Sequence, residues 1–372
     1  MPDYTKQAPA GTGTGGIEFT PPLADSRDFP PPSLSMLPGS TGRTSGDHGR
    51  PIPANTAGVL HLAWARNALA LLAMTHASAG QRVLLPAYHC PALVEPFSWS
   101  GASISFYPME ADLAPDMGWL EKQLTAEDIL LLVPFAGVTA TLSRPLSLAR
   151  ERGCLVIEDL AHAAFKRELQ GDYGVTSLQK FYPVQSGAEL LLAEGVDDSK
   201  LTQLWKSTIT GESAWRLRSF AGKIRGRLAH PPKQSGQPSY RYLQPEALGE
   251  PMRSADKRTL AAQDASWIAQ RRRERYVQLS DALDNSTIGA PLYPHLGPDD
   301  TPYVFPFLLH DAATFAAIRS AALPLYRWEE IATGHCEVSD DYRHRLVQLP
   351  CHQDLADSDM ELLLARLDSL AP

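Results

Sequence analysis

The stretches ILLLVPF (129–135) and CLVIEDL (154–160) enclose a helical pattern at 143–152, and this order decides the fold class. Short leucine-rich or β-branched runs of this kind are typical of buried strands, and a helix between two of them makes a βαβ unit. The same alternation extends outward through further strand-like and helix-like runs, at 82–88, 104–108, 66–78, 91–98 and 117–124. The sequence therefore predicts an α/β fold with a mostly parallel, doubly wound sheet.

Composition limits the class of partner. The chain has 372 residues, of which 44% are hydrophobic and 20% charged, with a formal net charge of −8. A nucleic-acid-binding protein needs a basic face to contact phosphates, and such a face is visible in the composition. We therefore expect small-molecule partners and no nucleic acid.

Apolar segments and cysteines indicate the compartment. The longest apolar run, VLHLAWARNALALLAM (59–74), is interrupted by His61, Arg66 and Asn67, and a membrane span needs about 20 apolar residues. The N-terminus has neither the basic start nor the apolar stretch of a secretory signal. Four cysteines lie far apart without CxxC spacing, which suits reduced thiols better than disulfides or a zinc site. These features predict a cytoplasmic protein with no membrane partner and no bound metal.

Changes in composition divide the chain into three parts. Residues 1–55 are rich in Pro, Gly, Ser and Thr and predict an arm, ordered only where it packs on the body. Residues 56–255 form the large α/β domain, with a loop-rich excursion at 208–255. Residues 256–372 carry a long helix, at about 256–284, and a small α+β domain. The arginines of that helix are expected on a solvated face.

The run VIEDLAHAAF (156–165) delivers acidic side chains where a strand ends. In a doubly wound sheet, ligands bind at the carboxyl ends of the strands. Asp159 there could be a metal ligand, an acid–base group or the partner of a protonated ring nitrogen, and His162 follows three residues later. The alternative is structural, with Asp159 as a helix N-cap and His162 in the first turn.

The run TSLQK (176–180) places a lysine directly after another strand. A buried lysine amine with a lowered pKa is nucleophilic and forms a Schiff base with an aldehyde, while the hydroxyl of Ser177 suits a phosphate. A lone lysine is far more often a surface residue. The combination of Lys180 with Asp159, 21 residues earlier, favours the chemical interpretation.

Two further stretches would meet at the same sheet edge. At Arg66 or Asn67 an apolar segment runs into a helix, whose first turn offers unpaired N–H groups for an anion. After Pro86 the chain presents Tyr88, His89 and Cys90, and a ring there could stack on a flat cofactor or pack under a loop. A carboxylate, a lysine, a helix start and a flat ring together are what pyridoxal 5′-phosphate (PLP) requires.

The same stretches, with GDYGVTSLQKFYPVQSGA (171–188), resemble the DegT-type aminotransferases, which are PLP enzymes of fold type I with a seven-stranded sheet and a smaller C-terminal domain. The family's acidic strand end matches Asp159, with His162 where the family has Gln or His. Its lysine precedes a Gly-Gly turn and matches Lys180, with Gly187 and Ala188 at the turn. The ring that usually stacks on the cofactor is replaced by Cys90.

The resemblance implies a reaction and a role for each residue. An amino group would pass from an amino acid, glutamate, to a keto sugar that is linked to a nucleotide, in polysaccharide or glycoconjugate biosynthesis, within a homodimer. Lys180 would anchor PLP and move the proton, and Asp159 would keep the pyridine nitrogen protonated. His162 would bind near the ring oxygen. The phosphate would be held by Ser177 and by the N–H groups near Arg66 and Asn67, with Tyr88, His89 or Cys90 at the ring.

Other interpretations stay open from the sequence. FYPVQ (181–185) fits a second register of the family motif, in which Gln185 occupies the lysine position and the protein is an inactive binding or scaffold subunit. A PLP enzyme of another reaction type is a further alternative, although the family's dehydratases replace the lysine by histidine. A Rossmann-type dinucleotide enzyme lacks the expected GxGxxG. Trp328 could line the acceptor side or pack in the core.

Overall fold

The computed structural model describes residues 17–20, 52–77, 79–209, 240–321, 323 and 325–370. Within them, one large sheet has the strand order β1-β7-β6-β5-β4-β2-β3. The strands are β1 (Thr56–Leu62), β2 (Arg82–Pro86), β3 (Ser103–Tyr107), β4 (Ile129–Leu132), β5 (Leu155–Leu160), β6 (Tyr173–Thr176) and β7 (Ala188–Ala193). The pairs from β3 to β6 are parallel, and β7 is antiparallel to both β6 and β1. The predicted α/β fold with a mostly parallel sheet is confirmed.

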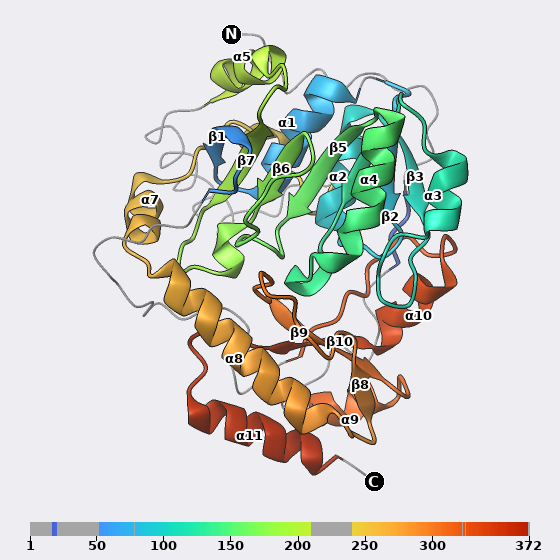
Figure 1. Ribbon diagram of the computed structural model, residues 1–372, viewed down its shortest axis with the longest axis vertical. Coiled ribbons are helices and arrows are strands. Elements are labelled where there is room, and N and C mark those ends of the chain that lie inside the picture. The colour runs from blue at the N-terminus through green and yellow to red at the C-terminus, as the bar shows by residue number, and fades with distance from the viewer. Residues whose placement is uncertain are drawn as a thin grey trace, which may run out of the picture.

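Helices cover both faces of this sheet. Helix α4 (Ser143–Arg152) crosses in front of it in Figure 1, whereas α1 (Ala65–His76) and α2 (Pro91–Ser100) lie behind it. All four residues of β4 are buried, which is expected of a central strand with both faces covered. Helix α3 (Met117–Gln123) contacts α4, and α5 (Ser199–Thr208) contacts α1. The apolar side chains of the sheet and helices form one continuous core.

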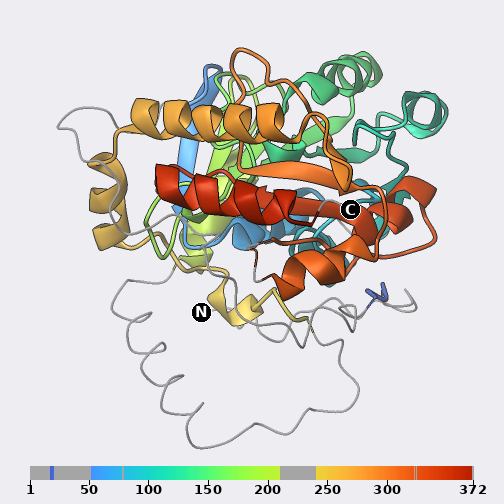
Figure 2. The ribbon, with the colours of Figure 1, turned by 90° about the horizontal axis from the view of Figure 1, so that it is seen from below.

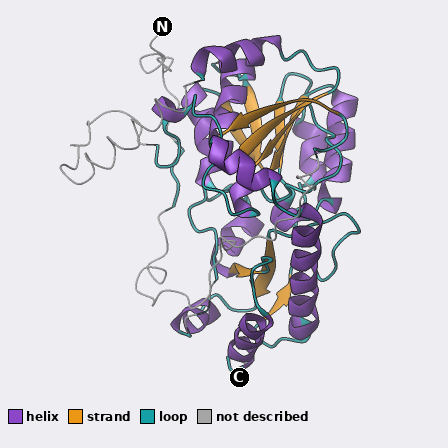
Figure 3. Ribbon diagram, turned by 90° about the vertical axis from the view of Figure 1, so that its left-hand side faces the viewer, coloured by secondary structure: helices purple, strands orange, loops and turns teal. Residues whose placement is uncertain are grey.

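A second, smaller sheet has the antiparallel order β10-β9-β8, with a core of its own. It lies below the large sheet in Figure 3, and α8 and α11 run side by side across it in Figure 2. The helices and strands of this part of the chain are α7 (Ser254–Ala261), α8 (Ala265–Leu283), β8 (Gly289–Pro291), β9 (Val304–Leu309), α9 (Thr314–Ser320), α10 (Glu337–Arg345), β10 (Leu346–Pro350) and α11 (Asp357–Asp368).

The prediction of one long helix at about 256–284 is wrong, because the helix breaks between α7 and α8. Asp264 is the N-cap of α8, and its side chain accepts a hydrogen bond of 2.9 Å from the N–H of Trp267. A cap of this kind satisfies an N–H group that has no partner inside the helix, and so it favours a new start. The expectation of solvated arginines also fails in part, since Arg272 and Arg275 are both 0% exposed.

Much of the predicted arm (1–55) and of the excursion (208–255) lies outside the described residues. Within the described part, Thr20 contacts the small domain, where its N–H and hydroxyl donate to the carbonyl of Ile331. The carbonyl of Ala54 accepts a hydrogen bond from the N–H of Leu169 in the large domain. These two pieces of the arm therefore pack on the body.

Three further findings concern the described residues alone. None of their helices is long and apolar enough to cross a membrane. No group of three or more His, Cys, Asp or Glu side chains among them could hold a metal ion. The four cysteines all lie in this part of the chain, and no disulfide joins them.

Candidate active site

Asp159 and Lys180 meet at the carboxyl ends of two neighbouring strands. In the β5–β6 register Asp159 lies opposite Val175, and β6 ends one residue later at Thr176. A 3₁₀ turn, Leu178–Lys180, then carries the lysine back toward β5. Asp159 is 7% exposed and accepts one hydrogen bond of 3.0 Å, from the N–H of Ala161. The two strand ends thus place an amine and a carboxylate in one buried region.

Burial dominates the protonation of both groups. It lowers the pKa of Lys180, while the charge of Asp159 and the thiol of Cys90 act in the opposite direction. Burial also raises the pKa of Asp159, against the charge of Lys180 and the Ala161 hydrogen bond. A lowered pKa increases the fraction of lysine present as the nucleophilic free amine at neutral pH.

Two aromatic side chains, His162 and Tyr303, lie near the amine of Lys180. The rings of His162 and Tyr303 stack with centroids 4.8 Å apart, and the Nζ of Lys180 lies 4.9 Å from the centroid of Tyr303. The ring of Trp328 also packs against His162, with centroids 5.3 Å apart. Burial and the charge of Lys180 lower the pKa of His162 well below its usual value. His162 is therefore neutral at physiological pH, and its buried Nδ1 has no hydrogen-bond partner.

The large and small domains approach each other closely beside His162. Gly137 has φ +95°, and a Cβ there would lie 2.4 Å from the carbonyl oxygen of Thr301 and 2.8 Å from that of His162. Only glycine fits such a position, because both the backbone conformation and the space exclude a side chain. The turn after β4 thus lets the segment before β9 reach the His162 loop.

Tyr88, His89 and Cys90, which follow β2, lie in different environments. Cys90 is the N-cap of α2, and its thiol interacts electrostatically with Lys180 and Asp159. Tyr88 is buried against Phe135 and Trp328. The structure therefore brings Cys90 to the lysine.

The imidazole of His89 is held inside the chain. It stacks 4.7 Å from Phe106, its Nδ1 lies 3.0 Å from the carbonyl of Pro86, and its Nε2 accepts from the N–H of Ala332. Burial lowers the pKa of His89 to about 4. Both ring nitrogens are engaged, so this ring has a packing role in the described structure.

The start of α1 lies beside the lysine turn. The carbonyl of Ala63, two residues before α1, accepts hydrogen bonds from the N–H of Gly187 (2.9 Å) and from Gln179 (3.2 Å). Arg66 in the first turn lies over the ring of Trp64 and interacts electrostatically with Cys90. The structure thus places the predicted anion site next to the turn that carries Lys180.

The side chains of Ser177 and Asn67 differ in availability. Ser177 is half-buried and precedes the lysine turn. Asn67 is 1% exposed and donates a hydrogen bond of 2.7 Å to the carbonyl of Ala247. Asn67 therefore holds the last part of the excursion, whereas no described hydrogen bond engages the hydroxyl of Ser177.

Gln185, the alternative lysine position, has its described contacts with Arg253 and Asp256. Its side chain is exposed and accepts a hydrogen bond of 2.8 Å from Arg253. Asp256 binds the N–H groups of Gln185 and Ser186 and fixes this turn. The geometry therefore favours the register in which Lys180 faces the strand-end carboxylate.

Sequence reasoning missed two residues of this region, Tyr303 and Arg272. Tyr303 precedes β9 in the run TPYVFPF (301–307), and an aromatic residue at a strand end was a usable signal. Arg272 lies in QRRRERY (270–276), where four arginines look alike and only the fold distinguishes them.

Comparisons with known proteins agree with this geometry. The profile of the DegT/DnrJ/EryC1/StrS aminotransferase family matches residues 63–187, the part of the chain that carries Cys90, Asp159 and Lys180. This segment is similar to that family. The match confirms the predicted resemblance and the enzyme class, a PLP-dependent aminotransferase. A search of the curated proteins finds no match.

Solved structures share the fold at low sequence identity. The aminotransferase TlmJ from Streptoalloteichus hindustanus is 18% identical with a TM-score of 0.64, and 84% of this chain covers 85% of that one. The Helicobacter pylori aminotransferase PseC, involved in pseudoaminic acid biosynthesis, is 14% identical with a TM-score of 0.63, at 85% and 87% coverage. A Streptococcus pneumoniae protein in its PLP form is 15% identical with a TM-score of 0.64, at 92% and 97% coverage. These likenesses confirm the fold type I architecture.

The residues of the site fit PLP, the family's cofactor. An aldehyde group needs an amine with a lowered pKa, which Lys180 provides. A pyridine nitrogen needs a buried carboxylate with few partners of its own, and Asp159 accepts a single described hydrogen bond. The Nδ1 of His162 is buried without a partner in the same region.

Proposed function

We propose that the protein transfers an amino group from an amino acid, glutamate, to the carbonyl of a keto sugar that is linked to a nucleotide. The observation that carries this proposal is the pair of half-buried Lys180 and buried Asp159 at the ends of adjacent strands, within the segment matched by the family. One structural neighbour named for pseudoaminic acid biosynthesis and one titled a putative sugar aminotransferase support the sugar class of acceptor. The product would serve polysaccharide or glycoconjugate biosynthesis.

In the proposed reaction Lys180 has two roles. Its Nζ would hold PLP covalently through the aldehyde carbon, C4′, and after release it would carry the proton between the α-carbon of the amino donor and that C4′ carbon. PLP, when bound, supplies an electron sink for the electrons left at that carbon. Burial of Lys180 supports both roles, because it favours the free amine.

Asp159 and His162 would set the electronic state of the site. The carboxylate of Asp159, held by the N–H of Ala161, would keep a proton on the pyridine nitrogen. His162 is neutral, because its pKa is lowered by burial, and would donate or accept a hydrogen bond without adding charge. The rings of Tyr303 and Trp328, which both pack against His162, would keep its orientation fixed.

The remaining predicted residues divide between ligand and support. Ser177 and the first-turn N–H groups of α1 near Arg66 would hold the phosphate, since a helix start favours anions. Cys90 would lie against the cofactor. The segments that carry these contacts would be held in place by Asn67, Tyr88 and His89, whose side chains contact other parts of the chain.

We further propose a homodimer in the cytoplasm, with the chain divided into an arm (1–55), a large domain (56–255) and a small domain (256–372). The strands of the large sheet fall within the second part and those of the small sheet within the third, which supports this division. Dimerisation and location follow from the family resemblance and from the sequence.

The test is spectroscopic. Purified protein is mixed with PLP, its near-visible absorption is recorded before and after glutamate is added, and borohydride reduction followed by peptide mass mapping locates the adduct. We expect a band that shifts with glutamate and an adduct on Lys180. An adduct on another lysine, or no band at all, would reject the assignment and return attention to the inactive alternative.

A further inference from the structure

Arg272 of α8 is buried without a carboxylate partner. Its side chain is 0% exposed, and no ion pair within 4.0 Å joins it to an acidic group in the described part of the chain. Burying a charged group costs several kcal/mol unless its donors are satisfied. An apolar residue would fill the same space without this cost, so the guanidinium is expected to do something that packing alone cannot.

The guanidinium of Arg272 joins three segments through carbonyl oxygens. Its Nη2 donates to the carbonyl of Lys180 at 2.9 Å, and its Nη1 donates to the carbonyls of Pro302 (3.1 Å) and Tyr303 (3.0 Å). Its Nε donates to the side-chain oxygen of Gln353 at 2.8 Å. One rigid, planar group thus holds the backbone of the lysine turn and the backbone of the segment before β9.

Two more contacts close this arrangement. The amide nitrogen of Gln353 donates to the carbonyl of Phe181 at 2.9 Å, next to Lys180. The Arg272 guanidinium also lies 4.6 Å from the ring centroid of Phe181. At the end of the lysine side chain, the Nζ of Lys180 lies 4.9 Å from the centroid of the Tyr303 ring. The backbone of Lys180 and the ring that covers its amine are therefore fixed by the same residue.

We propose that Arg272 is a positioning residue for Lys180, and that it fixes the lysine amine against a wall formed by Tyr303 of the small domain. This inference rests on the proposed role of Lys180 as the PLP-binding lysine. The amine then keeps one orientation and stays shielded from water. The small domain contributes to the site through this contact, in addition to any contact with substrate.

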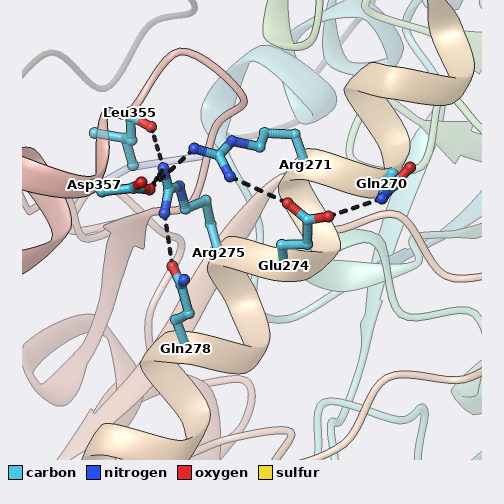
Figure 4. A network of polar contacts seen from close by, with 7 residues as sticks. All are labelled: Gln270, Arg271, Glu274, Arg275, Gln278, Leu355 and Asp357. Carbon is cyan, nitrogen blue, oxygen red and sulfur yellow. Dashed lines mark hydrogen bonds and ion pairs between the residues drawn. The ribbon is translucent and has the colours of Figure 1, made fainter.

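Arg275 provides a matched control. It lies three residues further along α8, is also 0% exposed, and donates to the carbonyl of Leu355 (2.7 Å) and the side chain of Gln278 (2.8 Å). It also pairs with Asp357 at the start of α11 (Figure 4). None of these described contacts reaches the lysine turn, so Arg275 tests the loss of a buried arginine without the proposed positioning.

The experiment measures the reactivity of Lys180 in the protein without added PLP. Wild type, R272Q, R272K and R275Q are treated with acetic anhydride from pH 7 to 10, and peptide mass mapping gives the acetylation of Lys180 at each pH. Thermal unfolding of each variant is recorded in parallel. The groups that face this amine are Asp159, Cys90, His162 and Tyr303, and all are retained in these variants.

We expect the pH at which Lys180 becomes acetylated to rise by about one unit in R272Q, because the released turn exposes the amine to water. A shift of this size corresponds to a roughly tenfold loss of free amine at neutral pH. R272K should not rescue it, since one ammonium cannot reach carbonyls on both sides of the lysine turn. R275Q should lower the unfolding temperature and leave the profile unchanged. An unchanged R272Q profile, or an equal shift in R275Q, would overturn the proposal.

A second pair of variants covers the case in which R272Q does not fold. Y303F keeps the ring over Lys180 and should retain the wild-type profile, whereas Y303L removes the ring and should change it. Equal profiles for Y303F and Y303L would overturn the proposal as well. The PLP band of wild type is measured separately, so its absence would reject the proposed function while the acetylation profiles still test Arg272.

Discussion

Two lysine–carboxylate pairs lie at the end of β5, and they differ in how completely the carboxylate is satisfied. Glu158 and Asp159 are neighbours on the strand, so their side chains point to opposite faces of the sheet. Glu158 is fully buried, pairs with Lys166, and accepts the N–H groups of Gln170 and Gly171 at 2.7 Å each. Asp159 faces Lys180 and accepts one N–H group.

The difference separates a structural pair from a reactive one. A buried carboxylate with a counter-charge and two further donors is well compensated, and its partners hold it in place. Asp159 has spare acceptor capacity, and burial shifts the pKa values of Asp159 and Lys180 toward their neutral forms. Perturbed pairs of this kind cluster at functional sites. If this contrast is correct, equivalent substitutions in the two pairs should affect different properties.

The largest expected effect is that of K180M on activity. Without the amine there is no covalent anchor and no proton acceptor, so turnover should fall by roughly 10³-fold or more. The measurement is the glutamate-dependent shift of the PLP band, followed under single-turnover conditions. K166M should keep both the band and the shift in its folded fraction. Activity retained in K180M would show that the two pairs had been assigned to the wrong roles.

K166M should instead affect stability. It leaves Glu158 buried with two N–H donors and no counter-charge, and breaking a buried pair from one side costs about 3–5 kcal/mol. Denaturant unfolding of the protein at neutral pH measures this loss. The double variant K166M/E158Q serves as the partner, because E158Q removes the charge that K166M leaves unpaired but keeps the shape of the side chain. A K166M protein as stable as wild type would contradict the structural assignment.

D159N should reduce turnover by about 10²-fold, since a neutral amide cannot hold a proton on the pyridine nitrogen. It also makes a prediction without cofactor. The carboxylate favours the ammonium form of Lys180, so its removal should lower the lysine pKa further and increase the free amine at a given pH. The acetylation profile of Lys180 should therefore move to lower pH in D159N and remain unchanged in E158Q. A move to higher pH in D159N would exclude the proposed coupling.

The sequence was sufficient to predict the strand ends of this site. Runs such as CLVIEDL are continuous and apolar because the strand is buried on both faces, and a charged residue at the end of such a run is conspicuous. Asp159 and Lys180 could be identified for this reason, together with the mostly parallel sheet. The register of the two adjacent strands brings their carboxyl ends together, where both residues lie.

Contacts between distant segments could not be predicted in the same way. Arg272 and Arg275 lie in a run of arginines whose spacing fits a solvated helix face as well as a buried one. Their burial depends on where the small domain packs against the lysine turn and on the position of α11. The engagement of His89 likewise depends on Ala332, 243 residues away in the chain. Local periodicity carries no information about such partners.

The smallest expected effect concerns His162, and it tests whether the site depends on a charge there. Burial lowers the pKa of this imidazole, so at and above its usual pKa of 6.5 the ring is neutral in the folded protein. H162Q keeps a neutral hydrogen-bonding side chain, and its turnover should stay within a few-fold of wild type, whereas H162L should lose about tenfold. The pH profile of turnover in H162Q should match that of wild type, because no proton leaves His162 in this range. A change of wild-type turnover near pH 6.5 that is absent in H162Q would mean that His162 titrates in this range. The environment that favours the neutral forms of Lys180 and Asp159 would then not extend to His162.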